Sequence, residues 1–127
     1  MAYEDERPLS PHLQVYRLPL TAVVSIIHRL TGLVIVLGAV LLIVVLFSVA
    51  AGPQSYATAQ AALDSWIGRL LLIGLTLALY FHLCNGVRHL FWDIGYGFEL
   101  ETVDRTALAT AVGALVLTSA TWLLALL

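Results

Sequence analysis

The sequence predicts an all-α integral membrane protein that crosses the membrane three times. Of its 127 residues, 61% are hydrophobic and 11% are charged, and the mean hydropathy is +0.95. A soluble domain has roughly half apolar and about a quarter charged residues. Because each spanning helix needs about 20 residues, the chain has room for three spans and little else. We therefore expect a single membrane-anchor domain over residues 1–127.

The first transmembrane helix is predicted over residues 20–51. Residues 1–19 precede it as an irregular cytoplasmic arm, because they are polar and their three prolines remove backbone donors. The helix contains an uncharged run from Leu30 to Ala51, and Gly52-Pro53 ends that run with a turn signal. The span is longer than the hydrocarbon core requires, so we expect it to tilt or protrude.

The second transmembrane helix is predicted over residues 65–92, with Asp64 as its N-cap. Trp66 and Trp92 then lie near opposite membrane faces, where aromatic side chains gather. The stretch over residues 52–63, between the first two spans, is uncharged and of mixed polarity. Such a composition is compatible with a short loop or with an interfacial helix.

The third transmembrane helix is predicted over residues 106–127. It contains no charged residue and many small ones, which favours a helix that packs closely against its neighbours and has no chemistry of its own. Residues 95–105, just before it, include three acidic side chains. We expect these residues to form a solvated loop.

The positions of the arginines predict the orientation in the membrane. Arg7 and Arg17 precede the first span, Arg88 and Arg105 flank the exit of the second, and only Arg69 lies near the first loop. By the positive-inside rule, the N-terminus and the second loop are cytoplasmic. The acidic start of the chain matches neither a signal nor a transit peptide. We therefore expect no cleaved targeting segment, and the bacterial inner membrane rather than the mitochondrial inner membrane.

Ionisable residues near the end of the second span are the most informative feature of the sequence. His82, Gly86, His89 and Asp93 recur at helical spacing and lie on one face, with Asn85 beside it. Burying polar side chains in a membrane is costly. This face is therefore expected to meet a partner helix, a cofactor or a water-filled cavity instead of lipid.

A second polar group lies near the cytoplasmic end of the first span, where Ser25, His28 and Arg29 occur together. At about 1.5 Å per residue, Arg29 lies roughly 14 Å from the start of its helix and His82 roughly 15 Å from the end of its own. An imidazole and a guanidinium are thus expected at one depth. A haem fits such a pair, because its iron takes a histidine nitrogen and its propionates bind arginine.

Ser25 and Arg29 are also four residues apart, so their hydroxyl and guanidinium share one helical face. Together they can hydrogen-bond the carbonyl oxygen of a quinone, whose tail belongs in lipid. Plainer roles stay open for each residue. The serine can bond its own helix, the arginine can reach lipid headgroups, and His82 can hydrogen-bond a neighbouring helix.

The composition argues against several other functions. All basic residues are arginines, they do not cluster, and the formal net charge is −2, so we expect no nucleic-acid partner. The single cysteine, Cys84, cannot form an internal disulfide. Zinc and iron–sulfur sites need several thiolates. Any aqueous chemistry must therefore come from partner subunits.

The two polar groups resemble the sequence signatures of a known family, the cytochrome b membrane-anchor subunit of succinate dehydrogenase, respiratory complex II. The first signature consists here of Arg7-Pro8-Leu9, Leu13, Leu20, Ser25, His28-Arg29 and Thr31. The second consists of His82, Gly86-Val87-Arg88-His89-Leu90, Trp92-Asp93 and Gly95. The length and the three-span layout are similar as well.

The resemblance implies a haem-binding helix bundle that this chain forms with a partner anchor subunit. His82 would be the axial ligand of the haem b iron, and the second small membrane-anchor subunit would supply the opposite ligand. His28 and Arg29 would lie near the haem propionates. Ser25 and Arg29 would line the site where ubiquinone is reduced.

The resemblance also implies the remaining partners, besides membrane lipid. Electrons would come from a flavoprotein subunit through an iron–sulfur subunit and pass to ubiquinone, which links the tricarboxylic acid cycle to the respiratory chain. Arg88, His89 and Asp93 would organise the rim that meets the iron–sulfur subunit. Because this chain has no flavin motif and no cluster cysteines, it is not expected to oxidise succinate by itself.

Rival functions remain beside this one. One is a structural anchor without haem, in which His82 only packs, and another is a fumarate reductase anchor that uses menaquinone. The chain can also hold both axial ligands itself, through His28 and His82. A small ion channel is disfavoured, because one polar cluster on one side of the membrane provides no continuous path.

Overall fold

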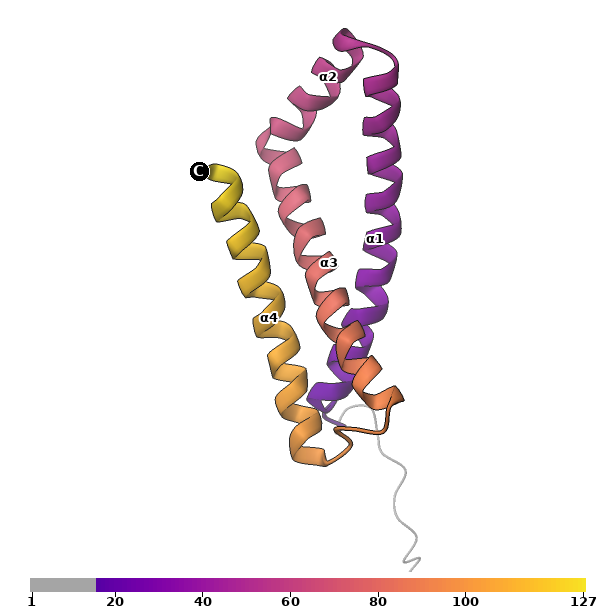
Figure 1. The fold of residues 1–127 in the computed structure, drawn as a ribbon, viewed down its shortest axis with the longest axis vertical. Helices are drawn as coiled ribbons and strands as arrows, with labels where there is room; N and C mark the ends of the chain where they lie inside the picture. The colour runs from indigo at the N-terminus through magenta and orange to yellow at the C-terminus, as the bar shows by residue number, and fades with distance from the viewer. Residues whose placement is uncertain (1–15) are drawn as a thin grey trace, which may run out of the picture.

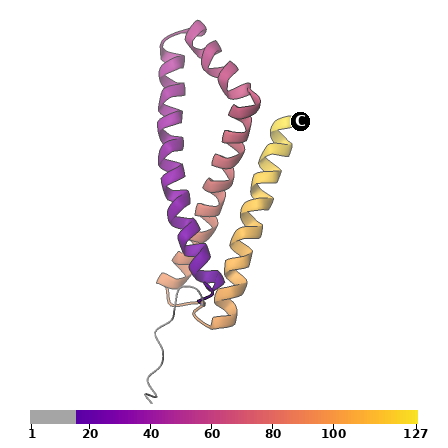
Figure 2. The same cartoon turned by 180° about the vertical axis from the view of Figure 1, so that it is seen from behind.

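The computed structural model describes residues 16–127, and within them the chain forms helices and no strand. The helices are α1 (Leu20–Ala50), α2 (Pro53–Asp64), α3 (Trp66–Asp93) and α4 (Leu100–Leu126). Figures 1 and 2 show three long helices, α1, α3 and α4, and the short α2, which joins the C-terminal end of α1 to the N-terminal end of α3. Most of the predicted arm, residues 1–15, lies outside the described residues.

The three long helices are the three candidate spans in residues 16–127, each long and apolar enough to cross a membrane. The predicted all-helical architecture with three candidate spans is thereby confirmed. Helix α1 begins at Leu20, directly after Pro19, which lacks a backbone donor and so fits a position just before a helix. It ends at Ala50, one residue before the predicted end.

The stretch between the first two spans is helical instead of a loop. Gly52 has a φ of +111°, a conformation that favours glycine, and Pro53 follows at the first helical position of α2. The prediction of Asp64 as the N-cap of the second span is wrong by one residue, because Asp64 ends α2. Ser65 caps α3 instead, and its Oγ accepts a hydrogen bond from the backbone nitrogen of Gly68 at 3.1 Å.

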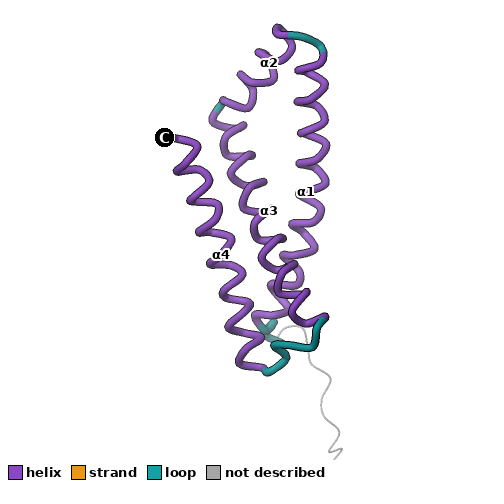
Figure 3. The backbone as a smooth tube through the Cα atoms, viewed as in Figure 1, coloured by secondary structure: helices purple, strands orange, loops and turns teal. Residues whose placement is uncertain are grey.

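The loop between α3 and α4 is shorter than predicted, as Figure 3 shows. Gly95 and Gly97 turn the chain with φ values of +87° and +85°, and α4 begins at Leu100, six residues earlier than predicted. The reason is local. Glu101 and Arg105 form an ion pair across one turn, and an acidic residue in the first turn favours a helix N-terminus.

Helix α4 packs along α3 with a row of small side chains. Its buried residues are Ala107, Thr110, Ala114 and Thr118. They recur every three or four residues, so they lie on one face. In lipid, small side chains allow the close backbone approach on which helix association depends. This is the packing role that the sequence predicted for the third span.

Helices α1 and α3 meet near the α3–α4 loop and diverge toward α2 (Figures 1 and 2). Val24 of α1 and Phe81 of α3 are both buried and belong to one small core. Elsewhere α1 exposes large apolar side chains, with Leu37 69% and Phe47 72% exposed. This surface must be covered by lipid or by another subunit, since water would not solvate it favourably.

Candidate functional site

His82 lies where α3 meets α1, and three residues of α1 surround its ring. Its Nδ1 is 3.2 Å from the backbone oxygen of His28 and 3.2 Å from Thr31 Oγ1. The rings of His82 and His28 are stacked, with centroids 3.9 Å apart and planes inclined by 14°. A Cβ added to Gly32 would lie 3.3 Å from His82 Cε1. The position and tilt of the imidazole are therefore set by α1.

His28 connects His82 with His89. The rings of His28 and His89 have centroids 5.5 Å apart, and His89 meets Trp92 edge to face at 5.0 Å. His82 and His89 thus lie on the same face of α3, toward α1, as their spacing predicted. His28 Nδ1 is buried and has no hydrogen-bond partner among residues 16–127. A buried polar atom without a partner lowers the stability of the fold by about 1–3 kcal/mol. Residues 16–127 alone therefore do not satisfy all the hydrogen-bonding atoms of the histidine cluster.

Ser25 and Arg29 lie on α1, within one turn of His28. Ser25 is half-buried and Arg29 is exposed. Within the described part of the chain, neither side chain has a hydrogen-bond partner. Among residues 16–127 nothing takes up their hydroxyl and guanidinium donors, which lie close to the histidine cluster.

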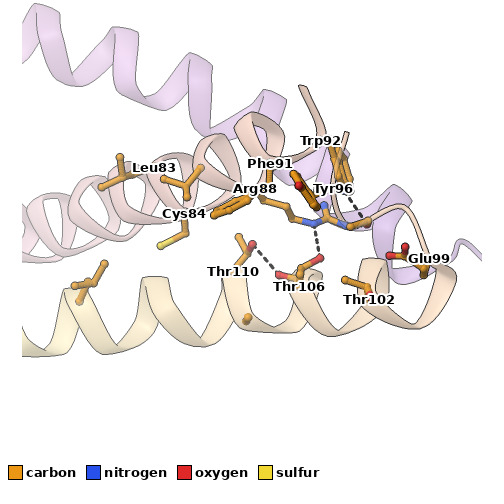
Figure 4. A pocket seen from close by; sticks show the side chains of 14 residues that line it. Leu83, Cys84, Arg88, Phe91, Trp92, Tyr96, Glu99, Thr102, Thr106 and Thr110 are labelled. Atoms are coloured by element: carbon orange, nitrogen blue, oxygen red, sulfur yellow. Dashed lines mark hydrogen bonds between the residues drawn. The ribbon is translucent and has the colours of Figure 1, made fainter. Parts of the chain in front are cut away.

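Arg88 extends from α3 toward α4, as Figure 4 shows. Its Nε donates to Thr106 Oγ1 at 3.0 Å and its Nη2 to the backbone oxygen of Val103 at 2.9 Å. Its Nη1 donates to Asn85 Oδ1 at 3.4 Å, and the guanidinium carbon lies 4.0 Å from the centre of the Trp92 ring. Only 6% of Arg88 is exposed. Arg88 therefore ties α3 to α4, and its part in organising the rim that meets the iron–sulfur subunit stays a prediction.

A groove of about 740 Å³ runs between α3 and α4 beside Arg88 (Figure 4). Its walls are mainly apolar, and include Leu83, Val87, Phe91 and Leu117. None of the residues predicted to bind haem or quinone borders it. The groove is therefore distinct from the place where the predicted site residues come together.

Replacing Arg88 with methionine is expected to lower the free energy of unfolding by about 1–3 kcal/mol. Asn85 is fully buried, its Nδ2 already has no partner among the described residues, and the change would leave its Oδ1 unpaired too. The matched control is Arg105→Met. Arg105 is exposed and pairs with Glu101 one turn away, an interaction worth less than about 1 kcal/mol. Thermal denaturation followed by circular dichroism gives the melting temperatures of the two variants. Equal melting temperatures would contradict the role of Arg88.

Sequence reasoning did not identify the contacts of His82 with Thr31 and Gly32. A signal existed for Thr31, because it follows His28 by three residues and so shares its face. Thr106 had no such signal. Its contact with Arg88 depends on how α3 and α4 are aligned lengthwise, which the spacing of residues within one helix does not determine.

Comparison with known proteins identifies the family. The family model described as succinate dehydrogenase/fumarate reductase transmembrane subunit matches residues 4–121. The succinate dehydrogenase cytochrome b556 subunit of Paracoccus denitrificans is 47% identical over 87% of this chain and 85% of the relative. For the subunit of that name in Rickettsia felis the identity is 38%, over 93% of this chain and 92% of the relative.

A succinate dehydrogenase cytochrome b560 subunit of Reclinomonas americana is 37% identical over 93% of this chain and 85% of the relative. The family match includes both polar clusters, the first two candidate spans and most of the third. The comparisons confirm the resemblance that the two signatures indicated. The chain belongs to the family of succinate dehydrogenase/fumarate reductase transmembrane subunits.

Proposed function

We propose that this chain anchors succinate dehydrogenase in the membrane, holds one side of a haem b and forms part of the site where ubiquinone is reduced. The names of the relatives, which match nearly the whole chain, support the anchor role and favour succinate dehydrogenase over fumarate reductase. The observation that carries the haem assignment is the hydrogen bonding of His82 Nδ1.

The geometry around His82 suits an iron ligand. The backbone oxygen of His28 can only accept a hydrogen bond, so the Nδ1 that lies 3.2 Å from it must hold the ring proton. Nε2 then keeps its lone pair for a metal. Histidines that bind metals almost always donate their other ring N–H in this way. Haem b would supply one-electron redox chemistry at this position.

The surroundings of His82 also leave room for a flat ring. Gly86 follows His82 by one turn of α3, and a Cβ at Gly86 would meet no atom within 4 Å. Arg29 is exposed on the facing helix and is suited to pair with a propionate. We assign His28 and Arg29 to the propionate side of the haem, and His82 to the iron.

We assign the other iron ligand to a second membrane-anchor subunit. His28 is a poor candidate, because its ring stacks face to face on His82 at 3.9 Å. Two rings stacked in this way leave no space for a porphyrin between them. The exposed apolar surface of α1 offers a second anchor subunit a large area to pack against.

Ser25 and Arg29 are assigned to ubiquinone. Both are hydrogen-bond donors, and they lie on one face of α1 near the end that the arginine distribution predicts to be cytoplasmic. A quinone carbonyl can accept from both while its tail stays in lipid. The iron–sulfur subunit would deliver electrons to this end of the chain, and the flavoprotein subunit would oxidise succinate.

Filling the space beside His82 tests the proposed function. Gly86→Leu is expected to reduce the haem content of the purified complex at least several-fold, because the added side chain occupies the seat of the macrocycle. Gly74→Leu is the matched control on α3, since a Cβ at Gly74 also meets no atom within 4 Å. Haem is quantified per flavin in complexes isolated through the flavoprotein subunit. Full haem content in Gly86→Leu, or equal loss in both variants, would contradict the assignment.

A further inference from the structure

We infer that Thr31 positions the imidazole of His82 for iron binding, an inference that rests on the haem function proposed above. Thr31 lies on α1 and His82 on α3, and their side chains meet where the two helices approach. Thr31 is only 8% exposed. Its hydroxyl is thus committed to partners within the protein and is largely shielded from water.

The hydrogen bonds around Thr31 have defined directions. Thr31 has one hydroxyl proton, which it donates to the backbone oxygen of His28 at 2.8 Å. Its oxygen lone pairs can then only accept. Because Nδ1 of His82 holds the ring proton, this N–H is shared between Thr31 Oγ1 and the His28 oxygen, each at 3.2 Å. The hydroxyl proton of Thr31 and the Nδ1 proton of His82 therefore each have an acceptor, and these two donors do not face each other.

Thr31 fixes the orientation of the His82 ring, which the His28 oxygen alone does not fix. The backbone oxygen alone selects the protonated nitrogen, but a single acceptor leaves the ring able to rock about its bond to Cβ. A second acceptor beside the first restricts that motion, while Gly32 lies close to Cε1. The lone pair of Nε2 is thereby aimed in one direction. Hydrogen bonding at Nδ1 also makes a ligating imidazole more basic.

Thr31→Val in the intact complex tests this inference, because valine keeps the branched shape and removes the hydroxyl. We expect roughly tenfold weaker haem retention and a broadened low-spin electron paramagnetic resonance signal, since ring orientation becomes less uniform. Without the Thr31 hydroxyl, the His82 imidazole is a less basic ligand and stabilises ferric iron less. The midpoint potential is therefore expected to become more positive, by up to the ~59 mV that corresponds to tenfold for one electron. Thr31→Ser, which keeps the hydroxyl, is expected to restore all three properties.

Thr118→Val is the matched control. Thr118 is 7% exposed and donates its hydroxyl to the Ala114 oxygen of its own helix at 2.7 Å, so its loss should leave retention, signal width and potential unchanged. The inference is overturned if Thr31→Val matches the wild type in these properties, or if Thr31→Ser behaves like Thr31→Val.

His82→Ala in the same series keeps this inference separate from the haem assignment. A low-spin haem that survives in His82→Ala overturns the assignment of the ligand itself. Haem loss in His82→Ala together with wild-type behaviour of Thr31→Val overturns only the role of Thr31.

Discussion

His82→Ala is expected to abolish the low-spin b-type signal in the reduced-minus-oxidised visible spectrum of the purified complex. The substitution removes the only nitrogen that this chain is proposed to give to the iron, and no other described side chain is placed to replace it. His89 is held against Trp92, and the ring of His28 stacks on the position of the lost imidazole. The low-spin signal should therefore disappear and not merely weaken.

Two neighbouring histidines serve as controls for this prediction. His89→Ala is expected to keep the low-spin signal, because His89 shares the helix face of His82 without contacting its ring. His28→Ala is expected to weaken haem retention, since it removes the stacked ring, and to leave the low-spin spectrum recognisable. A signal that persists in His82→Ala and disappears in His28→Ala would contradict the assignment.

Arg29→Ala is expected to raise the KM for ubiquinone roughly 10- to 100-fold. A hydrogen bond from a charged donor is worth about 1.5–3 kcal/mol, and about 1.4 kcal/mol corresponds to tenfold. Ser25→Ala removes a neutral hydrogen bond of about 0.5–1.5 kcal/mol, so its effect should be smaller. The measurement is succinate-dependent reduction of a soluble ubiquinone analogue at varied concentration.

Arg69→Ala is the control for Arg29→Ala. Arg69 is also exposed, but it lies in the first turn of α3, at the far end of that helix from His82. Reduction of a soluble dye by the dehydrogenase subunits should be unchanged in both variants, because it does not require quinone. Equal values of KM for ubiquinone in the two variants would contradict the role of Arg29.

Much of the fold follows from simple properties of the chain. Long uncharged apolar runs predict the three spans, and the fixed rise per residue places Arg29, with its neighbour His28, at about the depth of His82 before any packing is known. The stacked rings of His28 and His82 agree with this estimate of depth. The start of α4 was missed because the acidic composition of residues 95–105 suggested a loop, whereas the Glu101–Arg105 pair stabilises a helical turn there.

The surroundings of each polar side chain were harder to predict. Arg88 follows His82 by six residues, so the two point in different directions from α3, yet the periodicity does not say what lies on either side. The partners of Arg88 come from α4, and the acceptors for His82 come from α1. Both sets depend on the relative alignment of helices that are distant in the sequence.

The shared haem is tested most directly by the coordination state of the iron in this chain expressed alone and together with the second anchor subunit. Electron paramagnetic resonance distinguishes six-coordinate low-spin haem from other states. We expect the low-spin species only when both subunits are present, and its loss in His82→Ala. A six-coordinate low-spin haem in this chain alone, abolished by His28→Ala, would contradict the account, because both ligands would then come from α1 and α3.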